Sequence, residues 1–215
     1  YKVLALYKNI HPDIAAFNNV LNDYKHFDLK LKHVDEFDEN INDYNLLVIF
    51  GDIDKENIVS IINDSKVSLM IFDFNKSSFR NTLNNIISFS PKGYNEMIYV
   101  TKNSSFSKYT FSEGLLEFIK SSPPLNTSYG DYNLINGVEV VLYQRKLDED
   151  SDKPIVSLFE KDKRKIAFLT AEGFWKWRMF DFLNNNKHDF FNEFFIKLTQ
   201  YLMTDNNKER FRLNY

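Results

Sequence analysis

The sequence predicts an α/β fold in which a mostly parallel central sheet is covered by helices on both faces. Three short apolar runs, at residues 2–7, 46–50 and 67–72, indicate buried strands, and helix-like segments alternate with strand-like ones between them. Continuous apolar runs are typical of parallel strands that are buried on both faces, and parallel strands need a crossover between them. We therefore expect right-handed β-α-β units.

The first of these units begins with residues 2–7 (KVLALY), a short apolar strand. His11-Pro12-Asp13 follows it, where proline suits a first helical turn and aspartate favours the positive end of the helix dipole. Apolar residues then recur at helical spacing over residues 14–24. Residues 27–34 alternate as a strand does.

The second unit begins with residues 46–50 (LLVIF), a buried strand that Gly51-Asp52 ends. Asp54 is the expected cap of a helix with apolar residues over 58–62. Residues 67–72 (VSLMIF) then form the third buried strand.

The middle of the chain has a different character. Residues 86–108 contain short, irregular runs, so we expect no long element there. A helix that begins at Ser112 is ended by Pro123-Pro124, because proline has no N–H and blocks the preceding turn.

Further strands are expected in the second half. Residues 138–145 and 154–160 form two of them, joined by an acidic loop at residues 148–153. A third, residues 165–170, leads into a segment that contains both tryptophans.

The last element is an amphipathic helix with an aromatic stripe. Its members are Phe190, Phe191, Phe194, Phe195, Leu198, Tyr201 and Leu202. We find no internal repeat and no linker, so residues 1–215 are expected to form a single domain.

Composition excludes several classes of function. The net charge is −3 and no long basic run is present, so the electrostatic signature of a nucleic-acid-binding protein is missing. There is no cysteine, which excludes disulfides, thiolate metal sites and a cysteine nucleophile. No apolar run reaches the roughly 20 residues that span a bilayer. Because the chain begins at Tyr1 and ends in a strand-like run, we expect a domain cut from a longer polypeptide.

Known catalytic and phosphate-binding motifs are absent from the sequence. It has no Gly-x-Ser-x-Gly, no Gly-x-Gly-x-x-Gly after the first strand and no Gly-x-x-x-x-Gly-Lys. The four histidines lack the spacing of metal ligands. We therefore expect neither a metal nor a cofactor.

Three polar residues follow predicted buried strands. His11 comes after the first strand, Asp52 after the second and Asp73 after the third. Ligands of open α/β sheets bind at the carboxyl ends of the strands, so these residues are candidates for binding one. Each also has a structural interpretation, as a hydrogen-bonded histidine or as a cap or turn former.

Glu172, Trp175, Trp177 and Arg178 form the most unusual cluster in the sequence, between a strand and a helix. The tryptophans are suited to a stacking platform, with the arginine binding an anionic group. Alternatively, the aromatic side chains anchor the final helices on the sheet, and Arg178 pairs with Glu172 or Asp181. The structural interpretation is favoured because the segment continues directly into the phenylalanine-rich helix.

In these residues the chain resembles the class I glutamine amidotransferase-like domains of Bacteroidetes membrane proteins that also carry a von Willebrand A region. The resemblance covers nearly the whole chain and rests on residues 11–16 (HPDIAA), 44–49 (YNLLVI), 123–125 (PPL), 142–144 (LYQ), 172–178 (EGFWKWR) and 211–212 (FR). It implies a flavodoxin-like, three-layer sandwich. It also implies a membrane anchor elsewhere in the parent protein, with this domain on the periplasmic side.

The resemblance does not extend to the catalytic elements. Active members carry a cysteine between glycines after the third buried strand, where this chain has Phe72-Asp73-Phe74. They carry His-Pro-Glu near the end, where this chain has Trp175-Lys176-Trp177. The resemblance therefore implies a pseudoenzyme that does not hydrolyse glutamine.

The sequence thus predicts a non-catalytic interaction or assembly module. Its Trp175/Arg178 edge, or the face near His11, is expected to dock against neighbouring domains of the same polypeptide or against a protein partner. The alternative is a small-ligand sensor in which His11, Asp52, Asp73 and Arg178 converge at the carboxyl edge. A third interpretation is a hydrolase with an unfamiliar Asp/His/Glu site.

Overall fold

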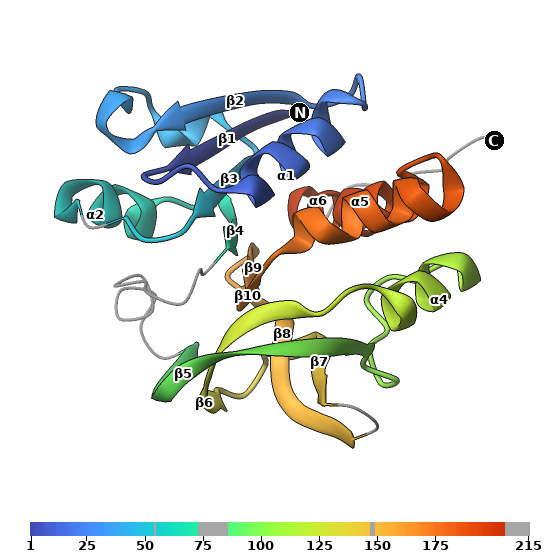
Figure 1. Cartoon of the computed structure of the whole chain (residues 1–215). Helices are drawn as coiled ribbons and strands as arrows, with labels where there is room; N and C mark the ends of the chain where they lie inside the picture. The colour runs from blue at the N-terminus through green and yellow to red at the C-terminus, as the bar shows by residue number, and fades with distance from the viewer. Residues whose placement is uncertain (54, 73–85, 147–148, 205–215) are drawn as a thin grey trace.

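The computed structural model describes residues 1–53, 55–72, 86–146 and 149–204. The strands are β1 (Lys2–Tyr7), β2 (Asp28–His33), β3 (Leu46–Phe50), β4 (Ser68–Phe72), β5 (Ile87–Lys102), β6 (Leu125–Leu134), β7 (Glu139–Lys146), β8 (Glu149–Lys161), β9 (Arg164–Leu169) and β10 (Ala171–Glu172). The helices are α1 (Pro12–Asn22), α2 (Glu56–Asp64), α4 (Glu113–Ser121), α5 (Phe174–Asn185) and α6 (Asp189–Met203), with 3-10 turns η1 (Val34–Glu36) and η2 (Ile41–Asp43). The described strands form one sheet in the order β10-β6-β5-β7-β8-β9-β4-β3-β1-β2 (Figure 1).

The N-terminal part of this sheet is parallel, as its apolar runs predict. β2, β1, β3 and β4 pair in parallel, and β9 continues the parallel arrangement beyond β4. Alternate side chains of β1 enter two different cores. Val3 lies in the core that contains Phe17 of α1, and Leu4 lies in the core that contains Ile58 of α2. Helices therefore cover both faces here, which explains why these strands are apolar along their whole length.

The prediction of a mostly parallel, flavodoxin-like three-layer sandwich is wrong. Among the described strands, β10–β6, β5–β6, β5–β7, β7–β8 and β8–β9 all pair antiparallel. The chain passes from β5 to β6 through α4 and from β8 to β9 through a two-residue turn, and β5, β6, β7 and β8 occupy the lower part of Figure 1. The sheet is therefore mixed, with a parallel half and an antiparallel half.

Two local features hide the antiparallel half from sequence analysis. Asp162 and Lys163 link β8 to β9 with φ values of 52° and 70°, a left-handed two-residue turn without the usual Asn-Gly signal. The expected irregular segment at residues 86–108 contains the long strand β5, whose pairing with β6 shifts register between Pro91 and Asn95. Proline and glycine are tolerated in strands at such bulges, so they do not end this one.

The antiparallel strands close on themselves. Thr170 alone separates β9 from β10, and β10 pairs with β6. The Thr127 hydroxyl of β6 donates to the Thr170 carbonyl at 2.8 Å, and the Thr170 hydroxyl donates to the Pro154 carbonyl of β8 at 2.7 Å. The path β6-β5-β7-β8-β9/β10 therefore forms a closed ring of strands that ends at the start of α5.

Aromatic side chains fill the core between the sheet and α1, α4, α5 and α6. Phe50 and Phe72 stack at the ends of adjacent strands with ring centroids 4.5 Å apart. Phe17 of α1 and Phe195 of α6 contact each other edge to face at 5.7 Å. The predicted aromatic stripe of the last helix is confirmed, since Phe191, Phe194, Phe195, Leu198 and Leu202 are buried.

Within the described ranges, no helix combines the length and the apolar character that crossing a bilayer requires.

Candidate functional site

The first turns of α1 and α5 meet at the carboxyl edge of the sheet. Gly173 is the N-cap residue of α5, has φ of 100° and offers no capping side chain. The buried Asp13 carboxylate of α1 replaces that cap, because it accepts hydrogen bonds from Gly173 N at 2.8 Å and Trp175 N at 2.6 Å. Burial raises the pKa of the Asp13 carboxyl, while the hydrogen bonds from Trp175 and Gly173 oppose that rise. The dipole of α5 favours a negative charge at its N-terminus, so the Asp13 carboxylate of α1 links the two helices.

His11 and Glu172, both candidates from the sequence, are brought together beside this cap. His11 Nδ1 accepts from Asp13 N at 3.2 Å, so the neutral ring carries its proton on Nε2. Nε2 lies 3.4 Å from Glu172 Oε2, and the other carboxylate oxygen accepts from Asn126 Nδ2 at 2.6 Å. The two side chains are 22% and 28% exposed, so solvent reaches the pair. The cluster joins α1 to β10 and β6.

Asp52 and Asp73 complete the residues predicted for this edge. Asp52 follows β3, whose end lies beside the end of β1, so it belongs to the same edge as the loop before His11. Asp73 lies outside the described residues, as do Asp54 and residues 211–212. In the part of the chain that the structure describes, no group of three or more His, Asp or Glu side chains is arranged to hold a metal.

Trp177 faces inward and is fully buried. Its ring contacts Phe174, Phe118 and Phe194, with centroids 5.3, 6.0 and 6.2 Å away. Its Nε1 donates to the Pro123 carbonyl at 2.8 Å, so the Pro-Pro segment before β6 supplies the partner that a buried indole needs. Trp175 is only partly buried. The two rings therefore do not form one stacking platform.

Arg178 points away from His11, toward the end of α1 and toward α6. It donates to Asn192 Oδ1 at 3.1 Å, and its other guanidinium nitrogen lies 3.8 Å from Asp23 Oδ2. Burial lowers the pKa of Arg178. The predicted partners were different, since Glu172 binds His11 and Asp181 caps α6 by accepting from Phe190 N and Phe191 N, both at 2.9 Å. The residues of the tryptophan segment thus have different roles. The Gly173 and Trp175 N–H groups bind the Asp13 cap, Trp177 is buried in the core, and Arg178 points toward α6 and the end of α1.

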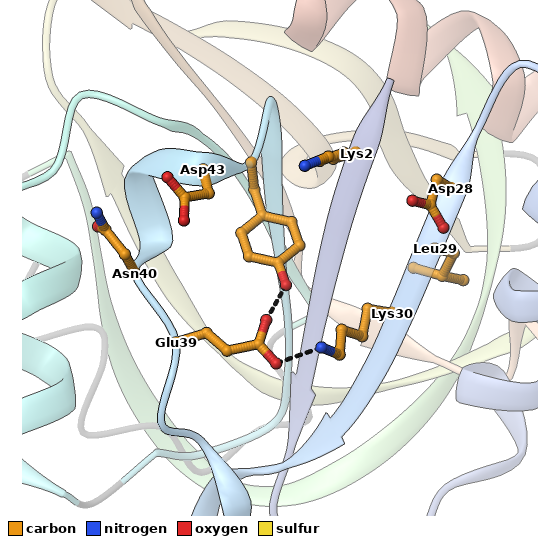
Figure 2. Close-up of a pocket in the computed structure, with 8 residues that line it drawn as sticks. Lys2, Asp28, Leu29, Lys30, Glu39, Asn40 and Asp43 are labelled. Carbon is orange, nitrogen blue, oxygen red and sulfur yellow. Dashed lines mark hydrogen bonds and ion pairs between the residues drawn. The ribbon is translucent and has the colours of Figure 1, made fainter.

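A pocket that the sequence analysis did not identify lies at the opposite, amino-terminal edge of the sheet (Figure 2). Its volume is about 710 Å³, and Lys2, Asp28, Leu29, Lys30, Glu39, Asn40, Asp43 and Tyr44 line it. The pairing of β1 with β2 brings Lys2 beside Asp28, and the segment between β2 and β3 supplies Glu39, Asn40, Asp43 and Tyr44.

No protein-family model matches the chain, and no curated protein matches it by sequence. Solved structures do match its fold. A cold-adapted β-galactosidase from Rahnella sp. R3 aligns with a TM-score of 0.59 and 10% identity, over 92% of this chain and 30% of the enzyme. An exo-β-1,4-mannosidase from Opitutaceae bacterium strain TAV5 aligns at 0.56 and 7%, over 91% and 35%. The chain therefore spans about a third of these glycosidases.

PurLQS from Thermotoga maritima aligns with a TM-score of 0.55 and 12% identity, over 92% of this chain and 98% of that one. The likeness to amidotransferase-like proteins is thus supported at the level of the fold. At such low identity the matches carry no activity over to this chain.

Proposed function

We propose that this chain is a non-catalytic, amidotransferase-like interaction module, and that the outer face of α5 binds an apolar helix of a partner protein. The observation that carries the proposal is a stripe of exposed apolar side chains on that face. Met179, Phe182 and Leu183 are 54%, 49% and 76% exposed. We call these three residues, together with the partly buried Trp175 at their N-terminal end, the α5 stripe.

The spacing of the α5 stripe matches helix-to-helix packing. Its members lie at positions i, i+4, i+7 and i+8, which places them on one side of a helix. The opposite side is already used, because Phe174, Trp177 and Asp181 are buried. Tryptophan, phenylalanine and methionine are enriched in protein interfaces, and adjacent exposed apolar residues typically mark one.

Sequence and geometry both support the non-catalytic part of the proposal. The chain has no cysteine to act as the nucleophile of class I amidotransferases. His11 serves as the N-cap of α1, and Glu172 accepts from Asn126. From the resemblance alone, the proposal includes a membrane-anchored bacterial parent protein with a von Willebrand A region, and a periplasmic location for this domain.

Site-specific photo-crosslinking in the natural host tests the proposal. A benzophenone amino acid replaces Leu183 in the intact parent protein. Met97, which is 73% exposed on β5, is replaced in the same way as a matched control. We expect position 183 to give one dominant crosslinked chain whose crosslink maps to an apolar helix, because the α5 stripe lies in the interface core.

Met179→Asp should reduce that crosslink on the order of tenfold, since an interface charge without a partner costs more than 1.4 kcal/mol. Met97→Asp should leave it unchanged. Equal, unspecific crosslinking from positions 183 and 97 would contradict the proposal.

A further inference from the structure

Four antiparallel strands bring aromatic and basic side chains together around the ring of Tyr129, which lies on β6. The ring of Tyr94 from β5 stacks on it, with centroids 5.2 Å apart and planes 12° from parallel. The ammonium groups of Lys146 from β7 and Lys153 from β8 lie 5.0 and 4.7 Å from the Tyr129 centroid. We call these four residues the Tyr129 cluster. Its members are far apart in the sequence, so strand pairing assembles it.

Two irregularities in strand pairing supply members of the cluster. The pairing of β5 with β6 shifts register over residues 91–95, and Tyr94 lies within that stretch. Residues 143–145 of β7 pair with the longer stretch 150–154 of β8, which contains Lys153. Such bulges often lie next to binding sites, where they re-aim a side chain. Here two bulges on different strands each direct a side chain to the same ring.

The cluster carries one positive charge that no ion pair balances. Lys146 pairs with Glu96, whose side chain is only 11% exposed. Lys153 takes part in none of the ion pairs among the described residues. Asp131, a carboxylate near Lys153, pairs with Lys92 at 2.6 Å. Two ammonium groups beside one ring repel each other, and a bound anion would relieve that repulsion.

The cluster also presents an aromatic surface to solvent. Tyr94 stacks on Tyr129 and nevertheless keeps 65% of its surface exposed. Aromatic rings pack favourably on one another in offset-stacked or edge-to-face geometry, so a further ring can join the Tyr94 side of the stack.

We infer that the Tyr129 cluster binds a small aromatic carboxylate. The carboxylate of the ligand binds the Lys153 ammonium, and its ring packs on Tyr94. A cationic ligand would meet two ammonium groups instead. A ligand with a single negative charge is favoured, because Glu96 already neutralises Lys146.

The inference is independent of the α5 stripe and is tested on the isolated chain by NMR titration. The probes are benzoate, phenylacetate and 3-phenylpropionate, which separate the ring from the carboxylate by increasing distances. Cyclohexanecarboxylate carries the charge without an aromatic ring, and benzyl alcohol carries the ring without the charge. We expect saturable shifts at Tyr94, Tyr129 and Lys153 with at least one aromatic acid. The other two compounds should bind about fivefold or more weakly than that acid, because each lacks one of the two contacts.

Substitutions separate the two halves of the site. Lys153→Gln should weaken binding of the best aromatic acid on the order of tenfold, and Tyr94→Ala should weaken it about fivefold. Lys25→Gln and Tyr24→Ala, at exposed positions after α1, are the matched controls and should leave the affinity unchanged. The spectra themselves report whether each variant is folded. Absence of saturable shifts, binding of cyclohexanecarboxylate as tight as that of the best aromatic acid, or insensitivity to Lys153→Gln would overturn the inference.

Discussion

At the scale of single residues, the structure gives most of the sequence candidates a defined contact. Sequence reasoning places His11 after one strand and Glu172 after another, and in the structure they lie 3.4 Å apart between the N-cap of α1 and β10. Asp13 was expected only to favour the dipole of its own helix. Its larger role, as the cap of a helix 160 residues away, depends on a tertiary contact that no local pattern encodes.

Asp13→Ala should lower the free energy of unfolding by about 2–3 kcal/mol, because it removes the cap of α5 and leaves the Gly173 and Trp175 N–H groups without this acceptor. Urea denaturation of the variant and of the unsubstituted chain measures this loss of stability. Asp64→Ala, at an exposed position of α2, should change the free energy of unfolding by no more than about 0.5 kcal/mol relative to the unsubstituted chain. Equal stability of the two variants would show that the contact is not structural.

The ion pairs of Glu39 predict how the stability of the fold depends on pH. Hydrogen bonds from Lys30, Lys32 and Tyr44 lower the pKa of the Glu39 carboxyl from 4.5 to about 2. Since the folded-state pKa is the lower one, the stability that this group contributes is fully present above pH 4.5 and is lost as the pH falls toward 2.

A carboxyl-detected NMR titration should place the Glu39 midpoint near that value. Added salt should raise it, because exposed ion pairs are screened. The double substitution Lys30→Gln and Lys32→Gln should also return it toward 4.5. A Glu39 midpoint at 4.5 in the protein without substitutions would disprove the ion pairs of Glu39 with Lys30 and Lys32.

At the scale of elements, apolar periodicity predicts which strands and helices pack into the core, but it does not predict where the chain reverses direction. β1, β3 and β4 are continuous apolar runs, and α6 carries an aromatic stripe, so their burial follows directly from the sequence. β5 was missed because its bulge contains proline and glycine. α5 was expected to anchor the final helices, and Trp177 does so. The outward α5 stripe was not expected, because aromatic and apolar residues surround this helix in the sequence.

The two tryptophans should therefore differ in their effect on stability. Trp177→Ala removes a fully buried ring and should cost about 3–5 kcal/mol, whereas Trp175→Ala, at a partly buried position, should cost at most about 2 kcal/mol. Denaturation curves of the two variants measure the difference. If Trp177→Ala does not fold, Trp177→Phe keeps most of the packing and should lose about 1–3 kcal/mol, because the Pro123 carbonyl is left without a donor. Equal losses of stability at positions 175 and 177 would contradict the assignment of Trp177 to the inward side of α5 and of Trp175 to its outward side.

At the scale of the whole molecule, the sheet joins a parallel half to a closed antiparallel ring, and α5 begins where the two meet. The fold class was predicted incorrectly because direction reversals are set by turns such as Asp162-Lys163, whose residue types carry no strong signal. The inward side of α5 fixes this junction through Asp13 and Trp177. Its outward side carries the α5 stripe, and our central claim is that a partner covers this stripe.

Methionine oxidation in the natural assembly tests that claim most directly, because the chain contains its own controls. In the isolated chain, Met179 and Met97 are both exposed and should react with hydrogen peroxide at similar rates, while the buried Met70 should react slowly. In the assembly purified from the natural host, mass spectrometry should find Met179 oxidised on the order of fivefold more slowly, since partner contact excludes the oxidant. Met97 should remain unchanged. Equal oxidation of Met179 in the isolated chain and in the assembly would mean that the α5 stripe stays uncovered, and the proposed function would be wrong.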